Sequence, residues 1–180
     1  LAKGDAPGAV KQFEWIVQSY GTNAEHFYNL ALAQVQNRQE NQAIVTLDRA
    51  LASETNYVDA VILQSTLLLR QGSFGRVASS LRDLISRGER LAPSEQARLP
   101  YAFALLARAQ AGLKNISDAV ATYDAMRKSF PGLIEVHLEA GNGFASFNRT
   151  NEAVKAYQEY VGLSTNSVGL LLAGNGLARL

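Results

Sequence analysis

Residues 43–50 read Ala-Ile-Val-Thr-Leu-Asp-Arg-Ala, and their apolar positions recur along the whole chain. Positions equivalent to Ala43 lie 34 residues apart, except for one interval of 42 between Val77 and Ala119. The sets that share this spacing are Ala9, Ala43, Val77, Ala119 and Ala153; Phe13, Leu47, Leu81, Tyr123 and Tyr157; and Ile16, Ala50, Leu84, Met126 and Tyr160. A fixed period of this length is typical of a solenoid, in which each unit buries its apolar face against its neighbours. Such a protein presents a surface for binding and seldom a catalytic cleft.

The composition excludes several classes of protein. With 47% hydrophobic residues in 180, the chain can bury a core and is not disordered. Its 17 basic and 16 acidic residues nearly cancel, so no global field attracts nucleic acid or an anionic membrane. There is no cysteine, which excludes disulfides, thiolate zinc sites and cysteine nucleophiles. No apolar run reaches the roughly 20 residues that cross a bilayer, so we expect no membrane insertion in this segment.

Apolar residues follow helical three-four spacing almost throughout, without the sustained alternation of strands. We therefore expect an all-α fold of about ten helices. The expected helices span residues 7–20, 24–37, 40–53, 58–71, 74–88, 99–113, 116–129, 133–147, 150–162 and 167–179. Asp5 followed by Pro7 is typical of a helix start, and Gly72 suits a left-handed helix cap. Because the connections are short, successive helices are expected to form antiparallel hairpins.

One segment, residues 86–99, lengthens the period by eight residues and concentrates charge. Such an insertion maps to a loop or to an overlong helix end on one face of a solenoid. Its charged residues and their neighbours are Arg82, Asp83, Arg87, Glu89, Arg90, Glu95 and Arg98. Two interpretations remain open: a local contact with a partner, or a solvated turn whose charges pair with one another.

Several units share a pattern of large, apolar and small residues. In one unit, Phe27, Leu30 and Ala31 precede Ala43 and Leu47. The later sets are Phe103, Leu106, Ala107, Ala119, Tyr123, Met126 and Pro131, and His137, Ala140, Gly141, Ala153, Tyr157 and Tyr160. This pattern resembles the tetratricopeptide repeat (TPR), whose 34-residue unit is two helices. The resemblance implies a right-handed superhelical solenoid of helix hairpins that binds proteins or peptides.

The resemblance divides the chain into repeats that form a single array. We expect a half repeat over residues 1–23, repeats over 24–57, 58–99 with the insertion, 100–133 and 134–167, and a half repeat over 168–180. The half repeats lead us to expect a segment of a longer protein. The final half repeat is apolar through Leu170, Leu171, Leu172, Leu177 and Leu180, without a polar cap. We therefore expect possible self-association through the uncapped ends.

Residues typical of catalysis or metal binding are scarce. The two histidines, His26 and His137, are far apart, and His137 does not share a helix face with Glu135 or Glu139. The triplets 141–143 and 174–176, each Gly-Asn-Gly, lie within expected helices, where close packing explains them better than phosphate binding does. Aromatic residues do not interleave with the arginines for base stacking. We expect no enzyme activity, no metal or cofactor, and no nucleic-acid partner.

In arrays that this chain resembles, the first helix of each hairpin lines a concave groove for a peptide or a partner helix. The repeat register places these residues in that groove: Tyr28, Leu32, Val35, Gln36, Asp59, Ile62, Thr66, Leu69, Arg70, Tyr101, Ala104, Arg108, Glu135, Leu138, Asn142 and Ala145. Arg70 and Arg108 either bind a ligand carboxylate or pair with a neighbouring acid such as Asp59. Family members that bind chaperone tails carry lysine, arginine and asparagine at positions held here by Tyr28, Leu32, Ile62 and Thr66, which disfavours that ligand.

The alanine-rich, cysteine-free units resemble bacterial repeat proteins in style. We therefore expect a non-catalytic, periplasmic scaffold that binds proteins of the cell envelope, in an assembly machine or in exopolysaccharide export such as that of cellulose. Two alternatives remain: a cytoplasmic adaptor that recognises a peptide, and the recruiting arm of a larger enzyme.

Overall fold

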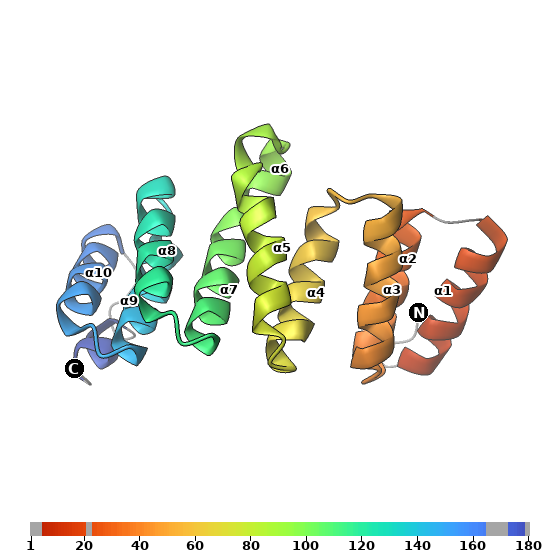
Figure 1. Cartoon of the computed structure of the whole chain (residues 1–180), viewed down its shortest axis with the longest axis horizontal. Coiled ribbons are helices and arrows are strands. Elements are labelled where there is room, and N and C mark those ends of the chain that lie inside the picture. The colour runs from red at the N-terminus through yellow and green to blue at the C-terminus, as the bar shows by residue number, and fades with distance from the viewer. Residues whose placement is uncertain (1–4, 21–22, 165–172, 179–180) are drawn as a thin grey trace. The chain divides into compact units, whose positions relative to one another are not determined.

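The computed structural model describes residues 5–20, 23–164 and 173–178, which are helical apart from short connections (Figure 1). The helices are α1 (Ala6–Tyr20), α2 (Ala24–Gln36), α3 (Glu40–Ser53), α4 (Val58–Arg70), α5 (Phe74–Ser86), the 3-10 helix η1 (Gly88–Arg90), α6 (Pro93–Gln96), α7 (Leu99–Gly112), α8 (Ile116–Ser129), α9 (Ile134–Ser146) and α10 (Thr150–Leu163). No strand occurs in the described ranges, which confirms the all-α prediction. The expected helix at 167–179 lies largely outside these ranges, although residues 173–177 are helical.

The chain divides into two compact units, unit 1 (Leu1–Arg98) and unit 2 (Leu99–Leu180). In unit 1, α1 packs on α2, and α2 with α3 and α4 with α5 form hairpins. In unit 2, α7 pairs with α8 and α9 pairs with α10. Both units are thus stacks of the helix hairpins that the sequence period predicts, and the division falls at the C-terminal end of the insertion.

The turn inside every hairpin has the same backbone geometry. Its middle residue lies in the left-handed region, and the four residues are Arg38 (φ 61°), Gly72 (φ 75°), Lys114 (φ 66°) and Asn148 (φ 57°). The next amide then donates to the carbonyl five residues back, as from Gln39 N to Gln34 O at 2.8 Å. This hydrogen bond satisfies a carbonyl at the helix end. The left-handed cap expected at Gly72 is confirmed, whereas the sequence did not reveal Arg38 or Lys114, since neither residue type favours this conformation.

Replacing the strained turn residues by glycine should stabilise the protein. Arg38→Gly and Lys114→Gly are each expected to raise the free energy of unfolding by about 0.5–1 kcal/mol, because glycine adopts positive φ without a Cβ clash. Gly72→Ala should lower it by a similar amount. Thermal unfolding followed by circular dichroism measures these changes, and a fall in Tm for both glycine variants would contradict the strain argument.

Small residues allow the hairpin helices to approach closely, and large side chains fill the space beside them. Ala31, Ala43 and Ala153 have no exposed surface. In unit 2, the close approach requires glycine: a Cβ on Gly141 would lie 2.6 Å from Cε1 of Tyr157, and one on Gly143 would be closer still to the Tyr123 ring. The interpretation of the first Gly-Asn-Gly triplet as close packing is therefore confirmed.

This packing predicts a matched pair of variants. Gly141→Ala should destabilise unit 2 by about 1–3 kcal/mol, because the buried Tyr157 ring must move. Gly174→Ala is the control, since a Cβ there meets no atom of the described residues within 4 Å.

Denaturant unfolding of both variants tests the close contact, and the rescue variant Tyr157→Leu identifies the ring as its cause. Leucine fills the equivalent position in unit 1, at Leu81. In the Tyr157→Leu background Gly141→Ala should cost less; an unchanged cost would show that the ring is not responsible.

Two hairpins contain the same buried polar contact. The hydroxyl of Thr46 donates to Oε1 of Gln34 at 2.8 Å in unit 1, and the hydroxyl of Thr122 donates to Oε1 of Gln110 at 2.7 Å in unit 2. These four side chains are buried, so the hydrogen bond avoids the cost of an unpaired polar group. It therefore fixes the second helix of each hairpin against the first without disturbing the core.

The insertion forms η1 and the short helix α6. Pro93 begins α6, and the Glu95 carboxylate accepts a hydrogen bond from the Ala92 amide at 2.8 Å. Arg87 pairs with Asp83 at 2.6 Å, and Arg98 reaches Asp59 on α4 at 3.1 Å. The Arg87–Asp83 pair joins two of the charges named for this segment, as one of the two interpretations expects, whereas Arg98 pairs with an acid outside it.

Candidate functional site

The predicted groove residues of unit 1 lie on α2 and α4, and none is buried. Tyr28 packs edge-on against Tyr57, with ring centroids 5.3 Å apart. The Thr66 hydroxyl donates to the Ile62 carbonyl of its own helix at 2.9 Å. The remaining predicted residues, Leu32, Val35, Gln36, Asp59, Leu69 and Arg70, are half-buried or exposed. This surface of unit 1 is therefore mainly aliphatic and aromatic.

In unit 2 the predicted residues lie on α7 and α9. Tyr101, Arg108, Glu135 and Asn142 are exposed, and Leu138 is half-buried. Of the two alanines expected beside them, Ala145 is half-buried like Leu138, whereas Ala104 is buried and does not reach the surface. The surface of unit 2 is thus more polar than that of unit 1.

Both groove arginines pair with acids of the protein. Arg70 Nη1 lies 2.6 Å from Glu40 Oε1, and Arg108 Nη2 lies 2.6 Å from Glu139 Oε1. Asp59, which we considered as a partner of Arg70, pairs instead with Arg98. Of the two alternatives for these arginines, the structure shows the pairing with a neighbouring acid. All these side chains are substantially exposed, so the ion pairs add little to stability.

Two buried tyrosines deliver their hydroxyls to the groove side of unit 2. Tyr123 donates to Glu139 Oε1 at 3.4 Å, and Tyr157 donates to Asn142 Oδ1 at 2.9 Å. Burial and the Glu139 carboxylate together raise the pKa of Tyr123 to about 12, against the opposing effect of Arg108. The Tyr123 hydroxyl therefore stays protonated in neutral solution and remains a hydrogen-bond donor. Unit 1 lacks this arrangement because Leu47 and Leu81 occupy the equivalent positions.

A hollow lies on the other side of unit 2, between α8 and α10, which are the second helices of its two hairpins. This groove has a volume of about 580 Å³ and is lined by Asp124, Arg127, Lys128, Pro131, His137, Lys155, Glu159, Gly162 and Leu163. The volume falls within the range of ligand-binding clefts. We call it the α8–α10 groove.

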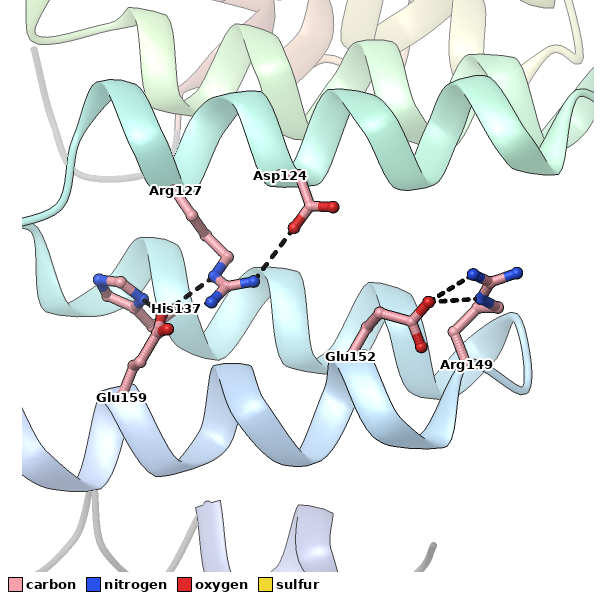
Figure 2. A network of polar contacts seen from close by, with 6 residues as sticks. All are labelled: Asp124, Arg127, His137, Arg149, Glu152 and Glu159. Atoms are coloured by element: carbon pink, nitrogen blue, oxygen red, sulfur yellow. Dashed lines mark hydrogen bonds and ion pairs between the residues drawn. The ribbon is translucent and has the colours of Figure 1, made fainter.

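An ionic network crosses the α8–α10 groove (Figure 2). Arg127 extends from α8, with Nη1 3.1 Å from Asp124 Oδ1 and Nε 3.2 Å from Glu159 Oε2 on α10. His137, near the start of α9, places Nδ1 2.9 Å from the same Glu159 oxygen and Nε2 3.0 Å from the Pro131 carbonyl oxygen. The network therefore joins three helices. Figure 2 also shows the separate pair Arg149–Glu152 near the start of α10.

The sequence contained a signal for this network that the groove prediction did not use. His137 is buried at a repeat position where the other units carry Phe27, Val61 and Phe103. Glu159 occupies the position of Arg49, whose guanidinium lies over the Phe27 ring at 4.4 Å. A polar residue at a core position of the repeat marks a local departure from the pattern, and such departures concentrate at functional or strained sites.

The carboxyl group of Glu159 is tuned by opposing effects. Burial raises its pKa, whereas hydrogen bonds and charge from Arg127 and His137 lower it, and the pKa lies below the ordinary value of 4.5. The Glu159 side chain is 35% exposed, so solvent screens part of the attraction. The ionised carboxylate is therefore the form that the folded unit favours.

The lowered pKa of Glu159 predicts that its ionised carboxylate stabilises the folded protein and that this stabilisation is lost in acid. A carboxyl group whose folded-state pKa is depressed stabilises the protein above its unfolded value of about 4.5, and that stability is lost as the pH falls through the folded pKa. Denaturant unfolding of Glu159→Gln should therefore show a shallower loss of stability below about pH 4.5 than the parent protein. Asp118→Asn, which removes one exposed carboxylate in the first turn of α8, serves as the control for the loss of a negative charge. Equal slopes for the parent and Glu159→Gln would contradict the assignment.

The described residues show neither a metal cluster nor a membrane-spanning helix. Among the residues that the structure describes, no three histidine, aspartate or glutamate side chains gather as a metal site. No helix in this part of the chain has the length and hydrophobicity needed to cross a membrane.

Comparison with known proteins gives a match in structure alone. No protein-family model matches the chain, and no curated protein matches it. MamA from Desulfovibrio magneticus RS-1 superposes with a TM-score of 0.71 at 15% identity, over 89% of this chain and 86% of that one. Pseudomonas aeruginosa PilF gives 0.70 at 14% identity, over 98% and 81%. YrrB, described as a TPR protein with an unusual peptide-binding site, gives 0.63 at 13% identity, over 94% and 84%.

The chain has the tetratricopeptide-repeat fold. The likeness to YrrB and the hairpins of both units agree on this point. At these identities the likeness concerns the fold alone. The 34-residue period, the small residues between helices and the left-handed turns are thus features of a TPR architecture.

Proposed function

We propose that this protein is a non-catalytic scaffold that binds a peptide or protein segment on the first-helix surfaces of its units. The observation that carries the proposal is the arrangement around Asn142 in unit 2. Its side-chain oxygen accepts the Tyr157 hydroxyl hydrogen at 2.9 Å, and the side-chain N–H groups of this exposed residue have no hydrogen-bond partner among the described residues. An amide group oriented in this way can donate to a peptide carbonyl without first losing rotational freedom.

The residues around Asn142 supply the other contacts that a peptide needs. Leu138, one turn earlier on α9, offers an apolar surface, and Glu135 offers a charge at the start of the helix. Tyr101 on α7 is 46% exposed, and tyrosine binds partners with little loss of side-chain entropy. In unit 1, Tyr28 and the aliphatic residues of α2 and α4 would take apolar side chains. The fold itself is compatible with this role, since YrrB is a TPR protein with a peptide-binding site.

For the biological setting we propose a bacterial periplasmic scaffold of the cell envelope, in an assembly machine or in exopolysaccharide export such as that of cellulose. The alanine-rich, cysteine-free composition supports this setting. Fractionation of the native host tests it. Recovery with the periplasmic fraction is expected, and recovery with the cytosol would reject it.

Affinity purification with the full chain as bait tests the binding surfaces. Tyr28→Ala in unit 1 and Arg108→Glu in unit 2 should each reduce recovery of a specific partner by about tenfold or more, as expected where a central aromatic or arginine contact is lost. The matched controls are Tyr20→Ala, a 68% exposed tyrosine on α1, and Arg149→Glu, an exposed ion-paired arginine on the second-helix side. These should retain the partner. If the two first-helix variants bind as well as the controls do, the proposal is wrong.

A further inference from the structure

We propose that the α8–α10 groove of unit 2 is a second interaction surface, which binds an acidic segment of a partner protein. This surface lies on the second-helix side of its hairpins and does not depend on the first-helix function proposed above. Its lining includes the network of Arg127, His137 and Glu159, together with Lys128 and Lys155.

The charges in the groove leave two cations without an acid. The carboxylates of Asp124 and Glu159 both pair with Arg127, so one guanidinium holds both of the acidic side chains that line the groove. Lys128 on α8 and Lys155 on α10 line the same groove, are exposed, and have no ion-pair partner among the described residues. An incoming carboxylate would therefore meet two lysines whose charge is not already neutralised.

The corresponding hairpins of unit 1 show that this charge is not a consequence of the repeat. The register that relates α3–α5 to α8–α10 places Leu51, Ala52, Val61 and Ser79 at the positions of Arg127, Lys128, His137 and Lys155. All three cations and the histidine are thus replaced by uncharged residues in unit 1. The two carboxylate positions, in contrast, remain acidic as Asp48 and Asp83. In unit 1 these two acids pair with Arg76 and Arg87, and Arg87 stands at the position of Leu163. Unit 1 therefore has no lysine at the positions of Lys128 and Lys155, and the two unpaired cations occur in unit 2 alone of the two sites.

The electrostatics of helix ends explain why a lysine stands at only one of the two positions. Lys128 lies in the last turn of α8, where a cation is favoured by the exposed carbonyl groups. Lys155, however, lies in the middle of α10, between Thr150 and Leu163, beyond the reach of either helix end. A structural role at a helix terminus therefore does not account for the pair.

The C-terminal end of the groove adds an apolar contact. Leu163 is 48% exposed. Pro131 and Gly162 line the same groove, and neither residue has a polar side chain. A partner segment that carries carboxylates for the lysines and one or two aliphatic side chains for Leu163 would match the whole lining. This combination distinguishes a peptide from a simple inorganic anion.

The test uses the full chain and a short fluorescein-labelled peptide of glutamates flanking two central leucines, with binding followed by fluorescence anisotropy. The parent protein should bind this peptide and should bind the glutamine counterpart much more weakly. Lys128→Gln combined with Lys155→Gln should weaken binding by about fivefold, the effect of losing two exposed ion pairs. Binding should also weaken as ionic strength is raised from about 0.05 to about 0.5 M.

The matched control removes the same charge elsewhere: Lys11→Gln combined with Lys114→Gln changes two exposed lysines outside the groove. It should bind as the parent does. Glu159→Gln should raise the affinity, because Arg127 then has one competing carboxylate fewer, whereas Asp118→Asn should not. Thermal unfolding of each variant checks that it is folded.

Three outcomes would overturn the proposal: no binding of the glutamate peptide, equal binding of the glutamine peptide, or equal loss in the two lysine double variants. The last would show that binding follows net charge and not the groove. None of these outcomes bears on the first-helix surfaces, so this proposal and the proposed function can fail separately.

Discussion

The architecture depends on the close approach of helices at positions that carry alanine or glycine. At Ala31 and Ala43 in unit 1 the side chains are fully buried, and the two helices of a hairpin meet around them. In unit 2 the close approach needs residues smaller than alanine, because Gly141 and Gly143 on α9 leave room for the rings of Tyr157 and Tyr123. Close packing of this kind tolerates little change in volume. The position of α9 in unit 2 is therefore determined by two aromatic rings as well as by its own turn.

That packing has a consequence for the surface. A leucine at the position of Tyr157 would fill the core without extending beyond it, as Leu81 does in unit 1. The tyrosine ring fills the same space, and its hydroxyl emerges beside Asn142. One side chain thus both stabilises the core and orients a polar group on the surface. The polar character of the first-helix surface in unit 2 follows from the glycines that make room for the tyrosines.

Most of the fold could be predicted from the sequence, because it depends on periodic apolar residues and short connections. Apart from η1 and α6 in the insertion, the helices in the described ranges agree with those expected, and Gly72 caps α4 as its residue type suggests. Arg38 and Lys114 could not be identified in the same way, since the hairpin geometry imposes their positive φ against their own preference. The local signal was absent because tertiary packing determines that conformation.

The candidate sites were less predictable than the fold. The repeat register located residues on the first helices, but Ala104 proved buried, and register alone does not show which charges pair. The partner of Arg70 is Glu40, 30 residues away on a neighbouring hairpin, because the stacking of hairpins determines which side chains meet. The α8–α10 network joins residues of three helices, so only the folded unit brings them together.

His137 shows why a departure from the repeat can be informative even though it does not improve packing. A phenylalanine at this position, as at Phe27, would be buried without any polar atom to satisfy. The histidine needs partners for both nitrogens, and it has them in Glu159 and the Pro131 carbonyl. Glu159 in turn needs Arg127, so one substitution in the core requires two charged residues on neighbouring helices. Buried ionic networks are seldom more stable than the apolar packing they replace. What the network of Arg127, His137 and Glu159 provides is a charged lining for the α8–α10 groove of unit 2.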